Sequence, residues 1–193
     1  LHRRQSGRRR HSLRVTTIFY IMKERYDVIV IGGGASGLMA AVAAAGEGCR
    51  VLIAEKMEKC GRKIRITGKG RCNITNITDT ETFLGKVRSG AEFVRKAVET
   101  LPPERLRQML EKAGVRTVEE RGRRLFPASG RAFEVADALV RMAERAGAEI
   151  VYHARVTDME RESDGWNITM ERRDGKQVRV SCSNAVIATG GVS

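Results

Sequence analysis

The sequence lacks a long apolar run and has few aromatic residues. Its longest uninterrupted apolar stretch spans residues 38–45, far short of the roughly 20 residues that a membrane-spanning helix needs. We therefore expect no transmembrane helix and no membrane partner. Five Phe, three Tyr and one Trp among 193 residues give little support to a surface that binds nucleic acid by stacking on bases.

The sequence also lacks closely spaced cysteines. The four cysteines lie at positions 49, 60, 72 and 182, and the chain has three histidines. Without a Cys-x-x-Cys pair, no metal site is expected. The apolar patch Ile18–Ile21 is too short for a secretory signal and no small-residue cleavage site follows it. Reduced thiols and a cytoplasmic location are the resulting expectation.

Acidic residues are scarce relative to basic ones: 23 Asp and Glu against 36 Lys and Arg, a formal net charge of +13. Six arginines and no acid lie in residues 1–21, which precede Met22. We interpret this segment as a basic extension, disordered or not native, with a mitochondrial-type presequence as the alternative. The other 172 residues hold 30 basic and 23 acidic residues, a net charge of +7, which weakens the case for nucleic acid. Residues 22–193 have the length of one domain.

An apolar strand runs directly into a glycine-rich turn. Residues 26–31 read Tyr-Asp-Val-Ile-Val-Ile, as in a strand buried in a parallel sheet. Residues 32–37 satisfy G-x-G-x-x-G, and an alanine-rich helical segment follows to about Ala45. A second strand over residues 50–54 ends at Glu55. This order predicts a βαβ dinucleotide-binding unit, the alternative being a plain strand–turn–helix packing motif.

Each residue type in the turn has a physical purpose. Gly32 permits the tight turn, Gly34 lets the backbone approach a diphosphate, and Gly37 lets the helix pack closely on the strand. The diphosphate is expected on the free N–H groups at the start of the helix, around Ala35 and Ser36.

The second strand ends in an acid that is followed by a basic loop. Glu55 is placed to accept hydrogen bonds from ribose hydroxyls and to repel a 2′-phosphate, which favours FAD or NAD over NADP. The glycine-punctuated loop that follows suits a second phosphate-bearing or anionic partner, although a solvated basic loop has the same composition.

Within this loop, Gly-Arg-Lys at 61–63, Thr-Gly-Lys-Gly-Arg-Cys-Asn at 67–73 and Thr-Asn at 75–76 resemble a bacterial family of FAD-dependent oxidoreductases. The family is known as aminoacetone oxidase-like or bile-acid dehydroxylation reductase-like flavoproteins, and the resemblance extends from Tyr26 to the C-terminus. It implies an α/β fold: a Rossmann-like FAD-binding domain of glutathione-reductase type, with a parallel sheet, helices and a three-stranded β-meander. Beyond the turn and Glu55, it places these residues at the FAD: Lys56, Lys63, Thr67, Gly68, Gly70, Arg71, Cys72, Asn73, Val156, Thr189 and Gly190.

The rest of the pattern agrees with that layout. Periodicity and turn residues predict helices, a small hairpin, a three-stranded meander and a last buried strand. The helices span residues 91–100, 103–113 and about 131–146, the last capped by Ser129. The strands span residues 115–119, 123–126, 149–159, 166–171, 177–182 and 185–188.

No second nucleotide motif, lid or substrate pocket is visible, and members of the resembled family continue with a substrate-side domain. We interpret residues 22–193 as the N-terminal part of a longer enzyme, incomplete at the C-terminus. The fragment is expected to be inactive by itself and to bind FAD weakly, because the cover over the flavin ring is absent.

The predicted function is an FAD-dependent oxidoreductase that acts on a small molecule, with NAD(P)H as a candidate electron donor. No catalytic residue is assigned. Cys72 is a candidate thiolate, but without a partner cysteine we favour a small residue packed beside the flavin. Arginines at 121, 123 and 124 are a candidate NAD(P)H phosphate site, although such a cluster at a hairpin turn is typical of a solvated face. The alternatives are an FAD-dependent RNA-modifying enzyme and a non-catalytic adenine-dinucleotide-binding module.

Overall fold

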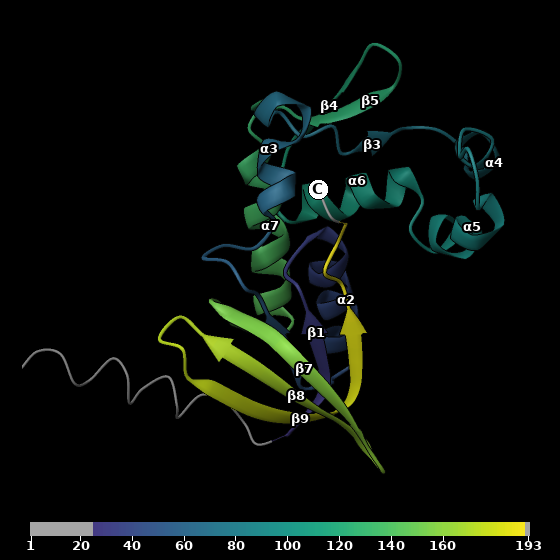
Figure 1. Cartoon of the computed structure of the whole chain (residues 1–193). Helices are drawn as coiled ribbons and strands as arrows, with labels where there is room; N and C mark the ends of the chain where they lie inside the picture. Colours follow the sequence, from purple (N-terminus) through teal and green to yellow (C-terminus); the bar gives the residue numbers. More distant parts are fainter. Residues whose placement is uncertain (1–24, 192–193) are drawn as a thin grey trace, which may run out of the picture.

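The computed structural model describes residues 25–191 of the chain, so the interpretation of residues 1–21 concerns a segment outside this range. Six strands form one mixed sheet in the order β6-β2-β1-β9-β8-β7 (Figure 1). They are β1 (Arg25–Ile31), β2 (Val51–Ala54), β6 (Glu149–Val151), β7 (Ala154–Glu162), β8 (Gly165–Arg172) and β9 (Gln177–Ile187).

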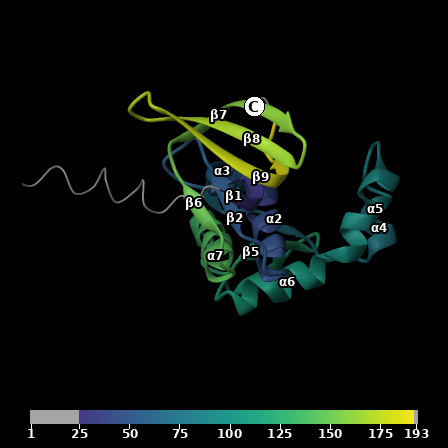
Figure 2. The ribbon, with the colours of Figure 1, turned by 90° about the horizontal axis from the view of Figure 1, so that it is seen from below.

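Two hydrophobic clusters cover the two faces of the parallel part of this sheet. Side chains alternate between the faces of a strand, so Val30 packs toward the helices α2 (Ala35–Gly46) and α7 (Ala132–Arg145). Ile29 instead belongs to the cluster with Ile168 and Met170 of β8. The parallel strands therefore lie between a helical layer and the antiparallel meander β7-β8-β9 (Figure 2). Burial on both faces explains why β1 and β2 are almost continuously apolar.

The strand boundaries near the C-terminus differ from the sequence prediction. The expected strand 149–159 is two strands, because the chain turns at Tyr152 and His153, where His153 has a φ of 53°. Before the turn β6 pairs with β2, and after it β7 pairs with β8. Conversely, the expected strands 177–182 and 185–188 are one strand, β9, which pairs antiparallel with β8 and then parallel with β1.

The basic loop predicted after Glu55 is partly helical. Residues Arg62–Gly70 form α3, which is broken at Thr67–Lys69; Gly68 and Lys69 there have φ values of 55° and 56°. The helix packs against α7 and is joined to it by an ion pair of 2.6 Å between Arg65 and Asp137. Strand β3 (Thr75–Asn76) and helix α4 (Thr80–Leu84) had no predicted counterpart.

A second, small sheet lies beyond the carboxyl end of β1, together with α3 and α6 (Figure 1). Its order is β3-β5-β4, and β4 (Thr117–Glu120) with β5 (Arg124–Pro127) confirms the predicted hairpin. The predicted helices are present as α5 (Ala91–Thr100), α6 (Pro103–Lys112) and α7. Ser129 is not the N-cap of α7, which is Arg131, but its Oγ accepts a hydrogen bond of 3.2 Å from the Arg131 N–H.

Helices α4 and α5 project away from the main sheet and pack mainly against each other (Figures 1 and 2). Among residues 25–191, no helix has the length and apolar character that crossing a membrane requires.

Candidate functional site

A cavity with a volume of about 1170 Å³ opens at the carboxyl ends of β1, β2 and β9. This is where α/β sheets bind their ligands, and the volume exceeds the roughly 300–1,000 Å³ typical of small-molecule sites. Thirteen residues predicted from the sequence line it: Gly32, Gly34, Ala35, Ser36, Glu55, Lys56, Lys63, Thr67, Cys72, Asn73, Val156, Thr189 and Gly190. The fold thus brings together segments that are more than a hundred positions apart in the sequence.

The glycines of the turn have contrasting surroundings. A Cβ at Gly37 would lie 1.9 Å from the Gly32 carbonyl oxygen, so Gly37 serves the close packing of helix on strand and does not line the cavity. A Cβ at Gly34 would meet no atom within 4 Å, and Gly34 lines the cavity. Because Gly34 has no side chain, the space beside its backbone is open, and a ligand can approach the backbone closely there.

The start of α2 presents free hydrogen-bond donors to this space. Gly34 is the N-cap, it has no side chain with which to cap the helix, and the first turn contains no acid. Ala35 and Ser36 are exposed and line the cavity. Because the first N–H groups of a helix lack intrahelical partners and carry the positive end of its dipole, they suit an anion such as a diphosphate.

Glu55 is buried, and its carboxylate links the glycine turn to the segment that follows β2. Its Oε2 accepts a hydrogen bond of 2.8 Å from the Gly33 N–H, and its Oε1 accepts one of 2.8 Å from the Met57 N–H. A carboxylate can accept about four hydrogen bonds, so both oxygens keep capacity toward the cavity. Glu55 therefore also holds the turn in place, a structural role that the sequence analysis did not assign.

The cavity is electropositive apart from Glu55. The other charged residues of the described chain that line it are Lys56, Lys59, Arg62, Lys63 and Arg155. The Nζ of Lys63 donates a hydrogen bond of 3.3 Å to the carbonyl oxygen of Gly191 and so joins α3 to the segment after β9. This charge favours a ligand with several negative charges. Arg62 belongs to the Gly-Arg-Lys motif at 61–63, whereas Lys59 and Arg155 had not been singled out from the sequence.

The remaining predicted residues, Gly68, Gly70 and Arg71, do not line the cavity. Gly68 and Gly70, both at positive φ, lie in the C-terminal part of α3, where the helix is broken. Arg71 points elsewhere: its guanidinium pairs with Glu120 and lies 4.5 Å from the centre of the Phe126 ring. The structure therefore does not bring Arg71 to the cavity, because the β4–β5 hairpin supplies it with both a carboxylate and an aromatic face.

Cys72 is a packed residue. It is 5% exposed, and burial raises the pKa of its thiol. Its backbone N–H donates a hydrogen bond of 3.0 Å to the Thr67 carbonyl oxygen. A raised pKa favours the protonated thiol over the thiolate, and the burial of Cys72 agrees with the interpretation as a small packed side chain.

Part of the cavity lining is apolar, which the motifs did not reveal. Among the apolar side chains that line it are Met39, Ile66, Ile74, Leu101 and Leu106. The sequence signal for Leu106 was the helical periodicity of residues 103–113. Among the described residues, no group of three His, Cys, Asp or Glu is arranged to hold a metal ion.

Comparison with known proteins supports a flavoprotein-type fold. A family model described as HI0933-like protein Rossmann domain matches residues 26–193. The chain is 30% identical over 171 residues to the ribosomal RNA dihydrouridine synthase of Escherichia coli (strain K12), covering 88% of this chain and 40% of that protein. It is 33% identical over 165 residues to the 3-dehydro-bile acid delta(4,6)-reductase of Clostridium scindens, covering 84% and 38%.

Among solved structures, the 3-ketosteroid-delta4-(5alpha)-dehydrogenase of Rhodococcus jostii RHA1 superposes with a TM-score of 0.66 at 19% identity, covering 91% of this chain and 48% of that one. The predicted α/β fold, a Rossmann-type FAD-binding domain, is confirmed. The chain spans about 40% of the length of the curated relatives described above.

Proposed function

The chain belongs to the family of HI0933-like Rossmann domains, and on that premise we propose that it is the FAD-binding part of an FAD-dependent oxidoreductase. One observation carries the proposal: an open space beside Gly34, at the uncapped start of α2, lies in a cavity lined by five cations and one carboxylate. The open space at Gly34, the free N–H groups at the start of α2 and the surrounding cations fit the diphosphate of a dinucleotide.

In this proposal the N–H groups after Gly34 bind the diphosphate, and Glu55 accepts hydrogen bonds from the adenosine ribose. Val156 contacts the adenine through its backbone. The Thr67–Asn73 segment, together with Thr189 and Gly190, borders the flavin end. FAD, when bound, supplies the hydride and electron transfer chemistry, while the protein provides binding, orientation and charge.

We further propose that the substrate carries a carbon–carbon double bond that the enzyme reduces. The two curated relatives described above are named for different molecules, yet the name dihydrouridine synthase and the name delta(4,6)-reductase both describe the addition of hydrogen across such a bond. A reduction needs a two-electron donor, and we propose NADH or NADPH for this role. The apolar side chains that line the cavity offer a surface for the ring or chain that bears the double bond.

The test is the absorption spectrum of the full-length protein as purified, followed by anaerobic addition of NADH and of NADPH. A bound flavin that is bleached by one of them is the expected result. A purified protein without a flavin spectrum, but with retained adenine-nucleotide binding, would instead establish the non-catalytic dinucleotide-binding module.

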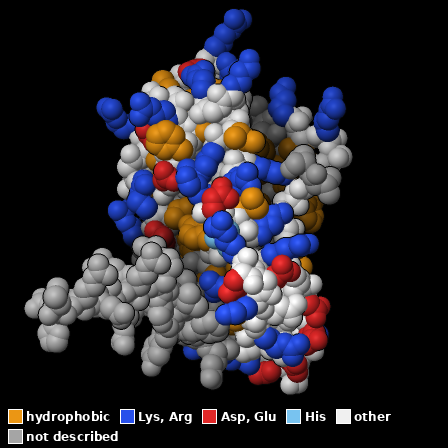
Figure 3. Space-filling view, turned by 60° about the vertical axis from the view of Figure 1, so that its left-hand side comes forward, with side chains coloured by type: hydrophobic (Ala, Val, Ile, Leu, Met, Phe, Trp, Pro, Cys, Tyr) orange, Lys and Arg blue, Asp and Glu red, His pale blue; other side chains and the backbone are white. Residues whose placement is uncertain are grey.

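An RNA-modifying enzyme is the second candidate, favoured by the relative that acts on ribosomal RNA and by the distribution of charge. Lys and Arg side chains gather over the upper part of the face in Figure 3, whereas Asp and Glu gather toward its lower end. RNA binding through such a face would weaken steeply as salt is raised. A salt-independent reduction of a small molecule, with no RNA binding, would remove this candidate.

A further inference from the structure

A second cavity, an open groove of about 620 Å³, lies between β3, α4 and the turn that joins β4 to β5. We call it the β3–α4 groove and define it by six residues: Asn73, Thr75, Asn76, Thr78, Lys86 and Arg123. It shares Asn73 and Ile74 with the first cavity, so the two spaces meet at the segment that we assign to the flavin end.

The chemistry of the groove is that of a hydrogen-bond donor site without an acid. No Asp or Glu is among the described residues that line it. The nearby carboxylate of Asp79 is occupied, since it accepts hydrogen bonds of 2.8 Å from both the N–H and the Oγ1 of Thr82 at the start of α4. Within residues 25–191, the side chains of Asn73, Thr78 and Lys86 make no hydrogen bond or ion pair to one another or to other residues.

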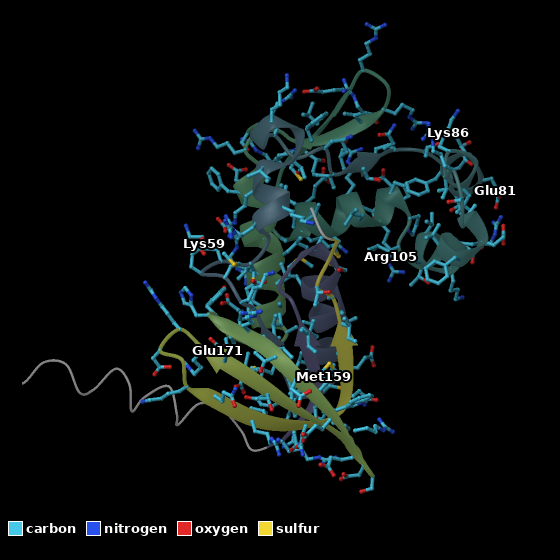
Figure 4. The ribbon with its side chains drawn as sticks, in the orientation of Figure 1. Lys59, Glu81, Lys86, Arg105, Met159 and Glu171 are labelled. Carbon is cyan, nitrogen blue, oxygen red and sulfur yellow. The ribbon has the colours of Figure 1, made fainter. Side chains whose placement is uncertain are left out.

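Two cations reach the groove from different elements. Lys86 follows α4, on the side of the molecule away from Lys59 of the first cavity (Figure 4). Arg123 lies in the β4–β5 turn, where its Nε is 3.3 Å from Glu119 Oε1.

The backbone at Arg123 is unusual for an arginine. Its φ is 58°, a left-handed conformation that Gly or Asn adopts at lower cost. Its carbonyl oxygen accepts a hydrogen bond of 2.8 Å from the Ile77 N–H, which fixes the turn beside the groove. The left-handed turn itself therefore favours Gly or Asn, and the arginine that stands there has a side chain that lines the groove and also pairs with Glu119.

We propose that the β3–α4 groove binds a phosphate group carried by the substrate. Two cations and several neutral donors from three elements match an anion with at least three oxygens and a charge between about −1 and −2, better than they match a carboxylate. That the phosphate belongs to the substrate of the flavin reaction rests on the proposed function; that the groove binds phosphate does not.

The test is a titration of the FAD-saturated chain with inorganic phosphate, followed by backbone amide NMR. The signals of Thr78, Thr82, Lys86 and Gly122 are expected to shift together with one dissociation constant. Glycerol 3-phosphate and uridine 5′-monophosphate, added separately, distinguish a phosphate on a small polyol from one on a nucleoside. Whichever binds more tightly than inorganic phosphate identifies the source.

Matched variants make the result decisive. Lys86→Ala should weaken phosphate binding about tenfold, the loss expected for one charge-assisted hydrogen bond. Lys96→Ala removes the same charge from α5, outside the groove, and should change the binding less than about twofold. Arg123→Gly suits the left-handed backbone, so it should weaken binding while leaving the chain at least as stable.

Equal weakening by Lys86→Ala and Lys96→Ala, or an absence of shifts in the groove, overturns the proposal. The flavin spectrum is read in the same samples. Phosphate shifts in the groove, combined with a full-length protein that is purified without flavin and binds none, would refute the proposed function but not the phosphate site, and the reverse result would refute the phosphate site alone.

Discussion

At the scale of single residues, we expect Gly34 to matter for FAD binding and Gly37 for the stability of the fold. Gly34→Ala places a methyl group in open cavity space, so FAD affinity should fall by about tenfold or more while stability falls by about 1 kcal/mol or less, the cost of alanine at an N-cap. Gly37→Ala drives its methyl group into the Gly32 carbonyl oxygen, which should destabilise the chain by about 3 kcal/mol or more. Thermal unfolding and FAD titration of both variants measure this. Similar losses of stability in the two would contradict the assignment.

Because of Cys60, we expect the free energy of unfolding to fall as the pH rises into the alkaline range. Burial, and then the nearby Glu55 carboxylate, raise the pKa of its thiol to about 11, whereas an unfolded cysteine titrates near about 8.5. The folded state thus holds this proton more tightly, so its contribution is complete below pH 8.5 and is lost as pH rises toward 11. Burial also raises the pKa of its partner Tyr152 to about 12, which extends the loss above pH 10.

The check is the free energy of unfolding in urea at a series of pH values between 7 and 10. The decline between pH 8.5 and 10 should be shallower in Cys60→Ala than in the unaltered chain. Cys49→Ala serves as the control, since Cys49 is only half-buried. Parallel curves for the unaltered chain and Cys60→Ala would refute the assignment.

At the scale of elements, α4 and α5 are the part of the described chain that is least connected to the rest. Helix α5 has no buried residue, and its Phe93 is 90% exposed. Local opening needs little free energy where few apolar contacts are broken. Limited proteolysis should therefore cut first within residues 79–100, leaving the six-stranded sheet intact by circular dichroism. First cleavage in the meander would contradict this, and masses of the early fragments decide between the two.

The elements that the sequence predicted well are those specified by local pattern. β1, α2 and β2 follow from an apolar run, a glycine turn and an alanine-rich helix, and α5 and α6 from periodicity with prolines between them. The helical part of α3 was missed because it is short and lies between Gly61 and Gly68, whereas the contacts that stabilise it, with α7 and through the Arg65–Asp137 pair, are tertiary. The continuity of β9 was missed for the same reason: nothing local indicates that one strand serves two partners.

In the candidate site, too, some residues follow from local sequence pattern and others depend on tertiary contacts. Residues of the glycine turn and Glu55 follow from spacing alone, since their roles depend on neighbours in the chain. The position of Arg71 depends on Phe126 and Glu120, which only the folded hairpin brings to it. Arg155, Leu101 and Leu106, which also line the cavity, come from segments that carry no motif.

At the scale of the whole molecule, the chain should bind FAD more weakly than the full-length protein. It spans about 40% of the length of its curated relatives, and in the proposed function its glycine turn and Glu55 bind the adenosine diphosphate half of FAD. We expect ADP and FAD to bind this chain with similar affinity, whereas the full-length protein should prefer FAD by about a hundredfold, equivalent to roughly 3 kcal/mol. Calorimetric titration of both proteins with both ligands tests this, and equal FAD affinities would refute it.

Strand β9 also constrains the order in which the molecule assembles. Arg25 pairs with Ser181 and Ile31 with Ile187, so one of the two neighbours of β1 in the sheet, β9, lies near the end of the described chain. Pairings so distant in sequence slow folding, because a long loop must close before they form. During synthesis on the ribosome, β1 and β2 emerge early and keep an open edge until β9 arrives. During that interval the unpaired edge of an apolar strand is exposed, and we expect the chain to be most prone to aggregation then.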